Sequence, residues 1–184
     1  YYRKSLELNP ESLSGRMAIS RIEGHRLDVR MQTDASALFG EGAQTGILES
    51  YFGQKPPGIK PEIFAPGIVS LGGHWEFSIS FFPDGSEIYF TRRKEDGGRN
   101  TMMVARLTEN GWTVPEEAAF AEGYPSNEPF ITPDGKILYY GTNRPRPGTE
   151  QISYGIWKTE RDGNDWGKAR YHGPGMYVSS DHSG

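Results

Sequence analysis

The chain has 184 residues and a formal net charge of −4, which leaves room for one ordinary domain with or without an appendage and argues against a polyphosphate partner such as nucleic acid. It contains no cysteine, so disulfides, thiolate metal sites and a cysteine nucleophile are excluded, and it has no run of about 18 apolar residues that would span a membrane. With 24 Gly, 13 Pro and 12% aromatic residues, the composition is typical of short strands joined by turns around an aromatic core.

Residues 1–24 are the only segment with helical periodicity. Asn9-Pro10 is a helix stop, and the apolar positions after it have helical spacing as far as Ile22. The run from Tyr2 to Pro10 resembles the closing third of a tetratricopeptide repeat, which implies a helical-repeat end; an ordinary pair of amphipathic helices is the alternative. We expect the chain to be a piece of a longer protein, because this apolar face needs an N-terminal neighbour and no initiating Met precedes it.

Residues 25–61 are expected to form an irregular segment that ends in a linker. Three prolines lie within 56–61, which excludes a helix there and favours an extended chain. We therefore place a boundary after residue 61, followed by a β-rich region over 62–184.

The β-rich region contains one turn motif twice. The motif is a proline–aspartate–glycine turn between an apolar run and an aromatic run, and its two copies lie 50 residues apart, at Pro83, Asp84, Gly85 and at Pro133, Asp134, Gly135. In such a turn Pro presets φ to about −65°, Asp accepts a hydrogen bond from the amide two positions on, and Gly takes the positive φ. Each copy therefore predicts a β-hairpin with a fixed register.

Each copy is expected to contribute four strands in about 50 residues, which is the content of one β-propeller blade. The expected strands are Phe77–Phe81, Glu87–Thr91, Thr101–Leu107 and Trp112–Val114 in the first copy, and Glu128–Ile131, Ile137–Gly141, Ile152–Lys158 and Trp166–Tyr171 in the second. The register also fixes which side chains share a face, with Ile88 and Phe90 opposite Tyr89, and Leu138 and Tyr140 opposite Tyr139.

The match continues beyond the hairpins. Arg93 corresponds to Arg144, 51 residues on, so the second copy has one extra residue near Gly141, where we expect a β-bulge. A third copy of the lead-in to the repeat begins at 176–179.

These features together resemble the TolB-type, WD-like β-propeller repeat over 64–184, in the turn, the aromatic strand after it and the Thr-Asn-Arg-Pro run at 142–145. The resemblance implies a mainly β fold, a partial β-propeller of four-stranded antiparallel blades behind a short N-terminal α-helical segment. Known propellers close with about four to eight blades, so the remaining blades are expected in the same longer chain and the two copies are expected to be poorly soluble alone. A generic antiparallel sheet is the alternative. The sequence departs from the repeat at Arg92, where Asn is more frequent.

Searches for catalytic and metal-binding motifs find none. No Gly-x-Ser-x-Gly, His-Glu-x-x-His or phosphate-binding loop pattern is present, and the four His, which include His74 and His182 at matching repeat positions, are far apart. Asp162–Asp165 is interpreted as a hairpin turn rather than a calcium loop. Adjacent Glu116 and Glu117 would point to opposite sides of a strand. We therefore expect no catalytic residue, metal or cofactor in this chain.

Arg93, Arg144 and Trp75 are the candidate binding residues. The two arginines, with Arg92 and Arg146 nearby, recur at one place in the repeat and could line a rim that takes carboxylates or sugar acids. The alternative is structural: each arginine would pair with the aspartate of a neighbouring turn, and Trp75 would serve in blade packing.

The resemblance implies a non-catalytic interaction module that binds a protein or peptide, in the periplasm or elsewhere in a bacterial cell envelope. Two alternatives stay open. The propeller could gate a hydrolase or peptidase whose catalytic domain lies outside this chain, as in prolyl oligopeptidase-like and tricorn-like peptidases, or it could bind carbohydrate. Fold likeness alone decides none of these, because one fold hosts many functions.

Overall fold

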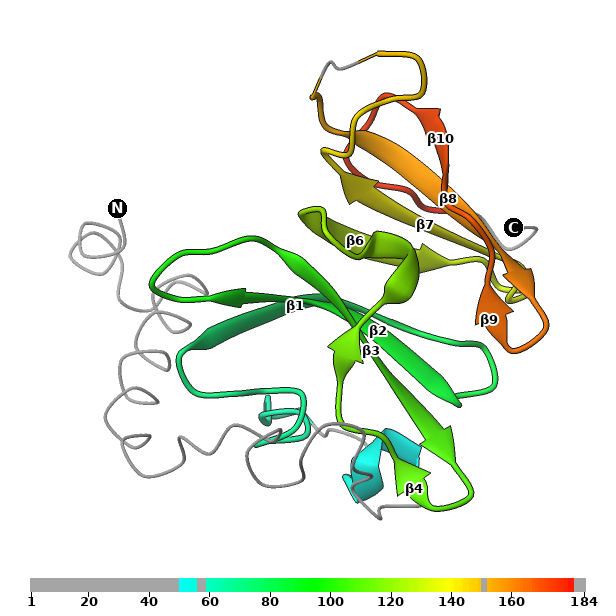
Figure 1. Ribbon diagram of the computed structural model, residues 1–184. Helices are drawn as coiled ribbons and strands as arrows, with labels where there is room; N and C mark the ends of the chain where they lie inside the picture. The colour runs from blue at the N-terminus through cyan, green and yellow to red at the C-terminus, as the bar shows by residue number, and fades with distance from the viewer. Residues whose placement is uncertain (1–49, 56–58, 150–151, 181–184) are drawn as a thin grey trace.

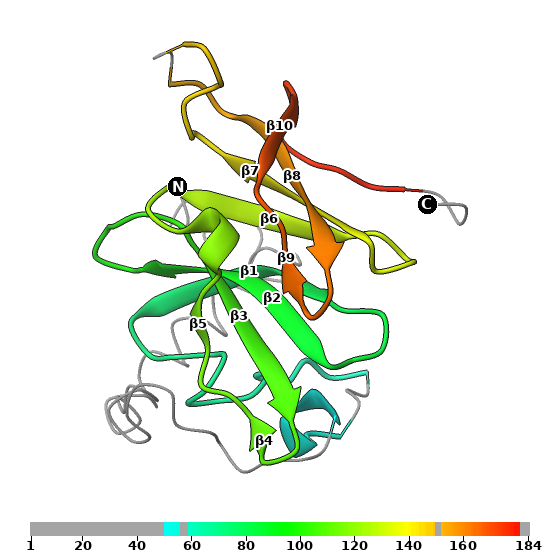
Figure 2. The same ribbon diagram turned by 45° about the vertical axis from the view of Figure 1, so that its right-hand side comes forward.

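The computed structural model describes residues 50–55, 59–149 and 152–180, which form two antiparallel β-sheets of five strands each, packed face to face (Figures 1 and 2). The mainly β class predicted from the sequence is confirmed. Helical structure in this part of the chain is confined to two short 3-10 turns, η2 (Ser50–Gly53) and η3 (Ala119–Ala121). The helices expected at 1–24 lie outside the described residues.

The two sheets share one plan. The first has the order β1-β2-β3-β4 with β5 also paired to β3, and its strands are β1 (His74–Phe81), β2 (Glu87–Lys94), β3 (Thr101–Thr108), β4 (Gly111–Trp112) and β5 (Glu116–Glu117). The second has the order β6-β7-β8-β10 with β9 also paired to β8, and its strands are β6 (Ser126–Ile131), β7 (Ile137–Thr142), β8 (Gly155–Asp162), β9 (Asp165–Trp166) and β10 (Arg170–Gly173). Each sheet therefore has three long strands and two short outer ones on the third.

The predicted strands are present with shifted ends. The run expected at 166–171 divides into β9 and β10, because Ala169 turns into the core between the sheets and leaves the ladder. β8 begins at Gly155 rather than Ile152, which is exposed. β5, formed by Glu116 and Glu117, is additional to the four strands expected of the first copy.

The proline–aspartate–glycine turns form as predicted. Oδ1 of Asp84 accepts from the Ser86 amide at 2.8 Å, and Oδ1 of Asp134 accepts from the Lys136 amide at 3.0 Å. The glycines have φ of 76° and 70°, in the left-handed region that glycine tolerates best. Hydrogen bonds from the side chain and amide of Ser86 lower the pKa of the Asp84 carboxyl, and those from the Thr132 hydroxyl and the Lys136 amide lower the pKa of the Asp134 carboxyl.

The β-bulge predicted at Gly141 is wrong: β7 pairs with β8 in unbroken register through that residue. The bulges lie instead in β1 and β6, at Ser78 and Glu128, which occupy equivalent positions of the two copies and share a φ of 54°. Glycine is favoured at 141 for a different reason: a Cβ there would lie 1.7 Å from the Tyr154 hydroxyl oxygen, so the Tyr154 side chain would have to move.

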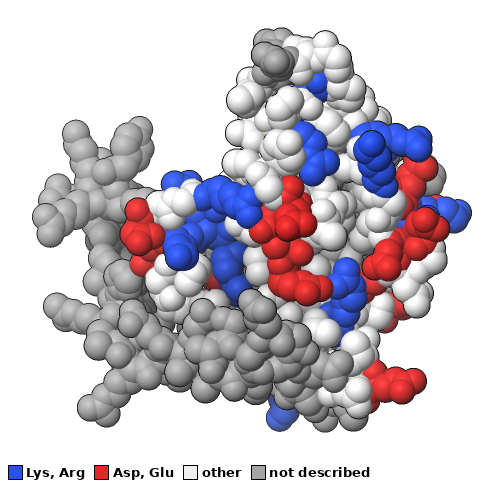
Figure 3. All heavy atoms as spheres, in the orientation of Figure 1, with Lys and Arg blue, Asp and Glu red and all other residues white. Residues whose placement is uncertain are grey.

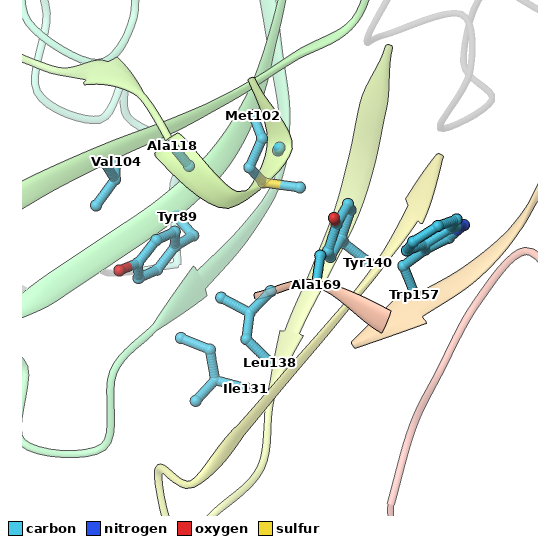
Figure 4. Packing of buried hydrophobic residues seen from close by; sticks show 10 residues of the cluster. Tyr89, Met102, Val104, Ala118, Ile131, Leu138, Tyr140, Trp157 and Ala169 are labelled. Carbon is cyan, nitrogen blue, oxygen red and sulfur yellow. The ribbon is translucent and has the colours of Figure 1, made fainter. Parts of the chain in front are cut away.

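The core between the two sheets is mainly aromatic and aliphatic. Figure 4 shows side chains of the first sheet pointing toward those of the second, and the cluster comprises Tyr89, Met102, Val104, Ala118, Ala121, Ile131, Leu138, Tyr140, Trp157 and Ala169. Tyr89 faces this core, whereas Ile88 and Phe90 belong to a second cluster on the other face of the first sheet. The predicted alternation of faces is confirmed.

The second cluster draws in residues that precede the expected boundary at 61. Phe52 is 7% exposed and stacks on Trp112 with ring centroids 4.3 Å apart. The Gln54 side chain donates to the Ile63 carbonyl and accepts from the Ala65 amide, both at 2.9 Å. The β unit therefore includes residues on the N-terminal side of the proline-rich segment.

A polar network crosses the interface between the sheets. Arg161 of β8 donates to both carboxylate oxygens of Glu87 of β2, at 2.6 and 3.2 Å, and Glu87 is 5% exposed. The Tyr89 hydroxyl donates to the same carboxylate and accepts from the Trp166 indole nitrogen at 2.7 Å. A buried ion pair is stabilising only when its remaining polar atoms are hydrogen-bonded. Here the Tyr89 hydroxyl and the Trp166 indole provide these further hydrogen bonds.

Candidate functional site

The sequence-predicted binding residues lie in two different sheets. Arg93 of β2 and Trp75 of β1 are paired across the first sheet, and the Arg93 guanidinium lies 5.9 Å from the centre of the Trp75 ring. Arg144 follows β7 in the second sheet. The structure thus brings Arg93 and Trp75 together and leaves Arg144 elsewhere.

A basic groove lies at the end of the first sheet where β1 begins and where β2 and β3 are joined. It encloses about 370 Å³ and is lined by His74, Arg92, Arg93, Lys94, Arg99 and Met103, among others. In Figure 3 a group of Lys and Arg side chains occupies this end of the first sheet, at the left of the view. We call these six residues the basic groove.

Carboxylates neutralise two of the four cations in the groove. Arg92 donates to Glu76 at 2.9 Å, and Arg99 to Glu117 at 2.5 Å. Burial raises the pKa of the Glu76 carboxyl although the Arg92 charge opposes the shift. Within the described residues, Arg93 and Lys94 make no ion pair. The groove therefore presents two side-chain cations to an incoming anion.

His74 of β1 lines the groove, and the neighbouring Trp75 contacts Arg93. The Trp75 ring is 40% exposed and its indole nitrogen donates to Glu95 at 3.1 Å. Nδ1 of His74 lies 3.1 Å from the Gly72 carbonyl oxygen, so this nitrogen carries the proton. An exposed indole beside these cations can contact apolar and anionic parts of one ligand.

A second set of basic side chains surrounds the start of the β7–β8 connection. The Arg144 guanidinium lies 4.7 Å from the Tyr124 ring centre and 5.2 Å from that of Trp157, and the Arg146 guanidinium lies 4.8 Å from that of Tyr171. The Trp157 and Tyr171 rings are 5.9 Å apart. We call these five residues, Tyr124, Arg144, Arg146, Trp157 and Tyr171, the arginine–aromatic cluster.

By its contacts, the counterpart of Arg144 is Arg92, not Arg93. Each donates to carbonyl oxygens of the segment that precedes the first strand of its own sheet: Arg92 to Ile68 and Val69 at 2.9 and 2.8 Å, and Arg144 to Phe120 at 2.9 Å. The sequence matches Arg93 to Arg144 by their spacing in the repeat, and this spacing carries no information about contacts. Only the folded structure shows that Arg92 and Arg144 each hydrogen-bond to the segment before the first strand of their own sheet.

The bulges at Ser78 and Glu128 are a feature that sequence analysis missed. β1 and β6 bring them together, and the Ser78 hydroxyl donates to a Glu128 carboxylate oxygen at 2.5 Å. A positive φ at residues other than glycine costs about 1–2 kcal/mol and often marks a functional site. Neither residue type signals such a backbone, and only the repeat spacing of the two positions could have drawn attention to them.

Asp162–Asp165 is the hairpin turn between β8 and β9, as predicted. Glu116 and Glu117 pair with different arginines, Arg106 and Arg99, consistent with opposite sides of a strand. In the part of the chain that the structure describes, no three potential ligands gather as a metal site and no helix is long and apolar enough to cross a membrane. His182 lies outside that part.

Comparison with models of protein families, with curated proteins and with solved structures found no match to this chain.

Proposed function

We propose that residues 62–184 are blades of a TolB-like β-propeller that acts as a non-catalytic interaction module and binds an acidic peptide or protein segment. The observation that supports this most is the repeat itself: two sheets with the same strand order, the same turn and the same bulge, packed face to face. Radial repetition of such sheets is how propellers protect their edges.

The outer face of the second sheet supports the presence of further blades. Tyr89 of the first sheet is 0% exposed because the second sheet covers it. Its counterpart Tyr139 is only half-buried, and it contacts Phe130 and His172 of its own sheet. A next sheet, supplied by a longer chain, would cover Tyr139 as the second sheet covers Tyr89.

The basic groove supports the choice of ligand. Arg93 and Lys94 have no carboxylate partner among the described residues, and the exposed Trp75 ring adds an apolar contact beside them. Arginine and an aromatic ring at the rim of a module favour peptides that carry carboxylates. We place this activity in a bacterial cell envelope, as the likeness to TolB-type repeats implies.

The test is direct binding of a defined peptide. A fluorescein-labelled hexapeptide of alternating Glu and Leu is titrated with the chain and followed by anisotropy, beside the same peptide with Gln for Glu. We expect the Glu peptide alone to bind, its affinity to fall with added salt, and Arg93→Gln with Lys94→Gln to weaken it about tenfold or more. Arg106→Gln, which removes a half-buried cation outside the groove that is paired with Glu116, should have little effect.

Two results would overturn the proposal. One is equal binding of the Glu and Gln peptides, or binding unchanged by the groove variants. The other is turnover of p-nitrophenyl esters or peptides by the longer protein that is lost with a flanking Ser, which would make these sheets the gate of a hydrolase.

A further inference from the structure

The arginine–aromatic cluster contains buried hydrogen-bond donors without acceptors. Nε of Arg144, Nε of Arg146 and Nε1 of Trp157 are all buried and have no hydrogen-bond partner among the described residues. Trp157 is 4% exposed, and Figure 4 shows its indole nitrogen on the side of the ring away from Tyr140. A buried donor without an acceptor costs about 1–3 kcal/mol, so three in one cluster call for an acceptor that the described residues do not supply.

The charge of the cluster gives the sign of that acceptor. All three atoms can only donate, and two belong to guanidinium groups that stay charged at any ordinary pH. In residues 50–55, 59–149 and 152–180, no carboxylate forms an ion pair with Arg144 or Arg146. The faces of the Tyr124, Trp157 and Tyr171 rings contact the guanidinium groups and stabilise their positive charge. They do not provide an oxygen acceptor for the Nε–H groups.

The first sheet shows what fills the corresponding position there. Arg92, which matches Arg144 in its contacts, donates from the same atom, Nε, to the Glu76 carboxylate at 2.9 Å. Glu76 pairs across β1–β2 with Arg92, and the residue at the same register position of β6 is Ser126. The Ser126 hydroxyl is occupied, because it donates to the Tyr124 carbonyl at 3.1 Å. The second sheet therefore has an arginine that contacts the segment before its first strand, but no carboxylate at the position of Glu76.

We propose that the arginine–aromatic cluster binds a carboxylate of a ligand. This carboxylate accepts hydrogen bonds from Arg144 as the Glu76 carboxylate accepts one from Arg92. A carboxylate offers two oxygens with about four acceptor sites, enough for both Nε–H groups and the Trp157 indole. Between partly buried guanidinium groups such bonds are about twice as strong as neutral ones. The site is separate from the basic groove, so it can fail while the groove binds its peptide, and the reverse.

The carboxylate can come from a peptide side chain or from a sugar acid, and both sources are tested. The chain is titrated with N-acetyl-glutamate amide and with D-galacturonate while the ¹H–¹⁵N signals of the arginine Nε–H and tryptophan Nε1–H groups are recorded. We expect the Arg144 and Trp157 signals to shift downfield with saturation for at least one of the two. N-acetyl-glutamine amide and D-galactose, which lack the carboxylate, should leave them unchanged.

Variants separate the site from general charge effects. Arg144→Gln and Arg144→Lys should each weaken binding about tenfold, because lysine keeps the charge but has no Nε–H. Trp157→Phe removes the indole donor and part of the ring but keeps an aromatic face, and it keeps the site testable if Arg144 variants fail to fold. Arg106→Gln is the matched control and should leave the affinity unchanged.

The site is established by saturating shifts of the Trp157 signal that Arg144→Lys abolishes and of the Arg144 signal that Trp157→Phe abolishes, and the probe that binds identifies the source. Binding of the galacturonate alone would keep this site and assign it a sugar acid. The inference is overturned if neither carboxylate moves the Arg144 and Trp157 signals, if inorganic phosphate or chloride moves them equally well, or if Arg144→Lys binds like the original chain. Peptide binding in the groove, measured with Arg93→Gln, is scored separately.

Discussion

The two sheets share one framework of turn, strand order and bulge, but their buried charged residues differ. Turn, strand order and bulge recur from the first sheet to the second. In the first sheet, Arg92 is neutralised by Glu76 and the opposite face carries Glu87, which Arg161 of the second sheet neutralises. In the second sheet, Ile137 occupies the register position of Glu87 and Ser126 that of Glu76.

The difference shows which parts of the repeat are fixed by backbone needs. The turn and the bulge set the register, so a change there would move a whole face of side chains from one side of the sheet to the other. The charged positions lie near strand ends, on either face of the sheet, where a compensating change in a single neighbour suffices. Repeats can therefore keep their framework and diverge in what they bind.

The largest effect is expected from breaking the ion pair between the sheets. Arg161→Met leaves the Glu87 carboxylate, 5% exposed, without its cation, and should lower the free energy of unfolding by about 3 kcal/mol. Urea unfolding followed by tryptophan fluorescence and circular dichroism measures it. Arg106→Met breaks the exposed pair with Glu116 and should cost about 0.5 kcal/mol. Equal losses in the two variants would show that the buried pair does not hold the sheets together.

The second largest effect is expected at a position where the side chains of the two copies differ in size. Gly141 of the second sheet matches Thr91 of the first by strand register. Gly141→Ala places a Cβ 1.7 Å from the Tyr154 hydroxyl oxygen, and the resulting overpacking should cost about 2 kcal/mol. The double variant Gly141→Ala, Tyr154→Ala should lose less than the two single losses added together. Simple additivity in thermal unfolding would contradict this contact.

The shared bulge should give smaller and nearly equal effects in the two sheets. Ser78→Ala and Ser78→Gly both remove the hydroxyl that donates to Glu128, but only glycine relieves the φ of 54°. We expect the glycine variant to be more stable than the alanine variant by about 1 kcal/mol, and the same difference between Glu128→Gly and Glu128→Ala. An alanine variant as stable as the glycine variant at either site would show that the backbone there is not strained.

Local sequence rules predicted the framework and failed at its long-range contacts. The turns at Asp84 and Asp134 were predicted because their hydrogen bonds join residues two apart in the chain. The bulge was placed at Gly141 because glycine is a common bulge residue, yet the positive φ belongs to Ser78 and Glu128, whose types give no such signal. The sequence proposes Arg144 as a candidate and pairs it with Arg93, because the contact that makes Arg92 its counterpart runs to a carbonyl in a distant segment of the chain.

The smallest effect concerns the turn aspartates. Asp134 accepts from the Thr132 hydroxyl and the Lys136 amide, and these bonds lower the pKa of its carboxyl to about 2. Its unfolded value is about 3.9, so the folded state binds this proton less readily, and the stability that the ionised turn contributes is full above about pH 4 and is lost as the pH falls toward 2. Asp134→Asn should remove this part of the acid dependence and leave the remainder, including the share of Asp84, whose pKa is also lowered. A carboxyl ¹³C titration of Asp134 with its midpoint near 4 would contradict the turn's role in acid stability.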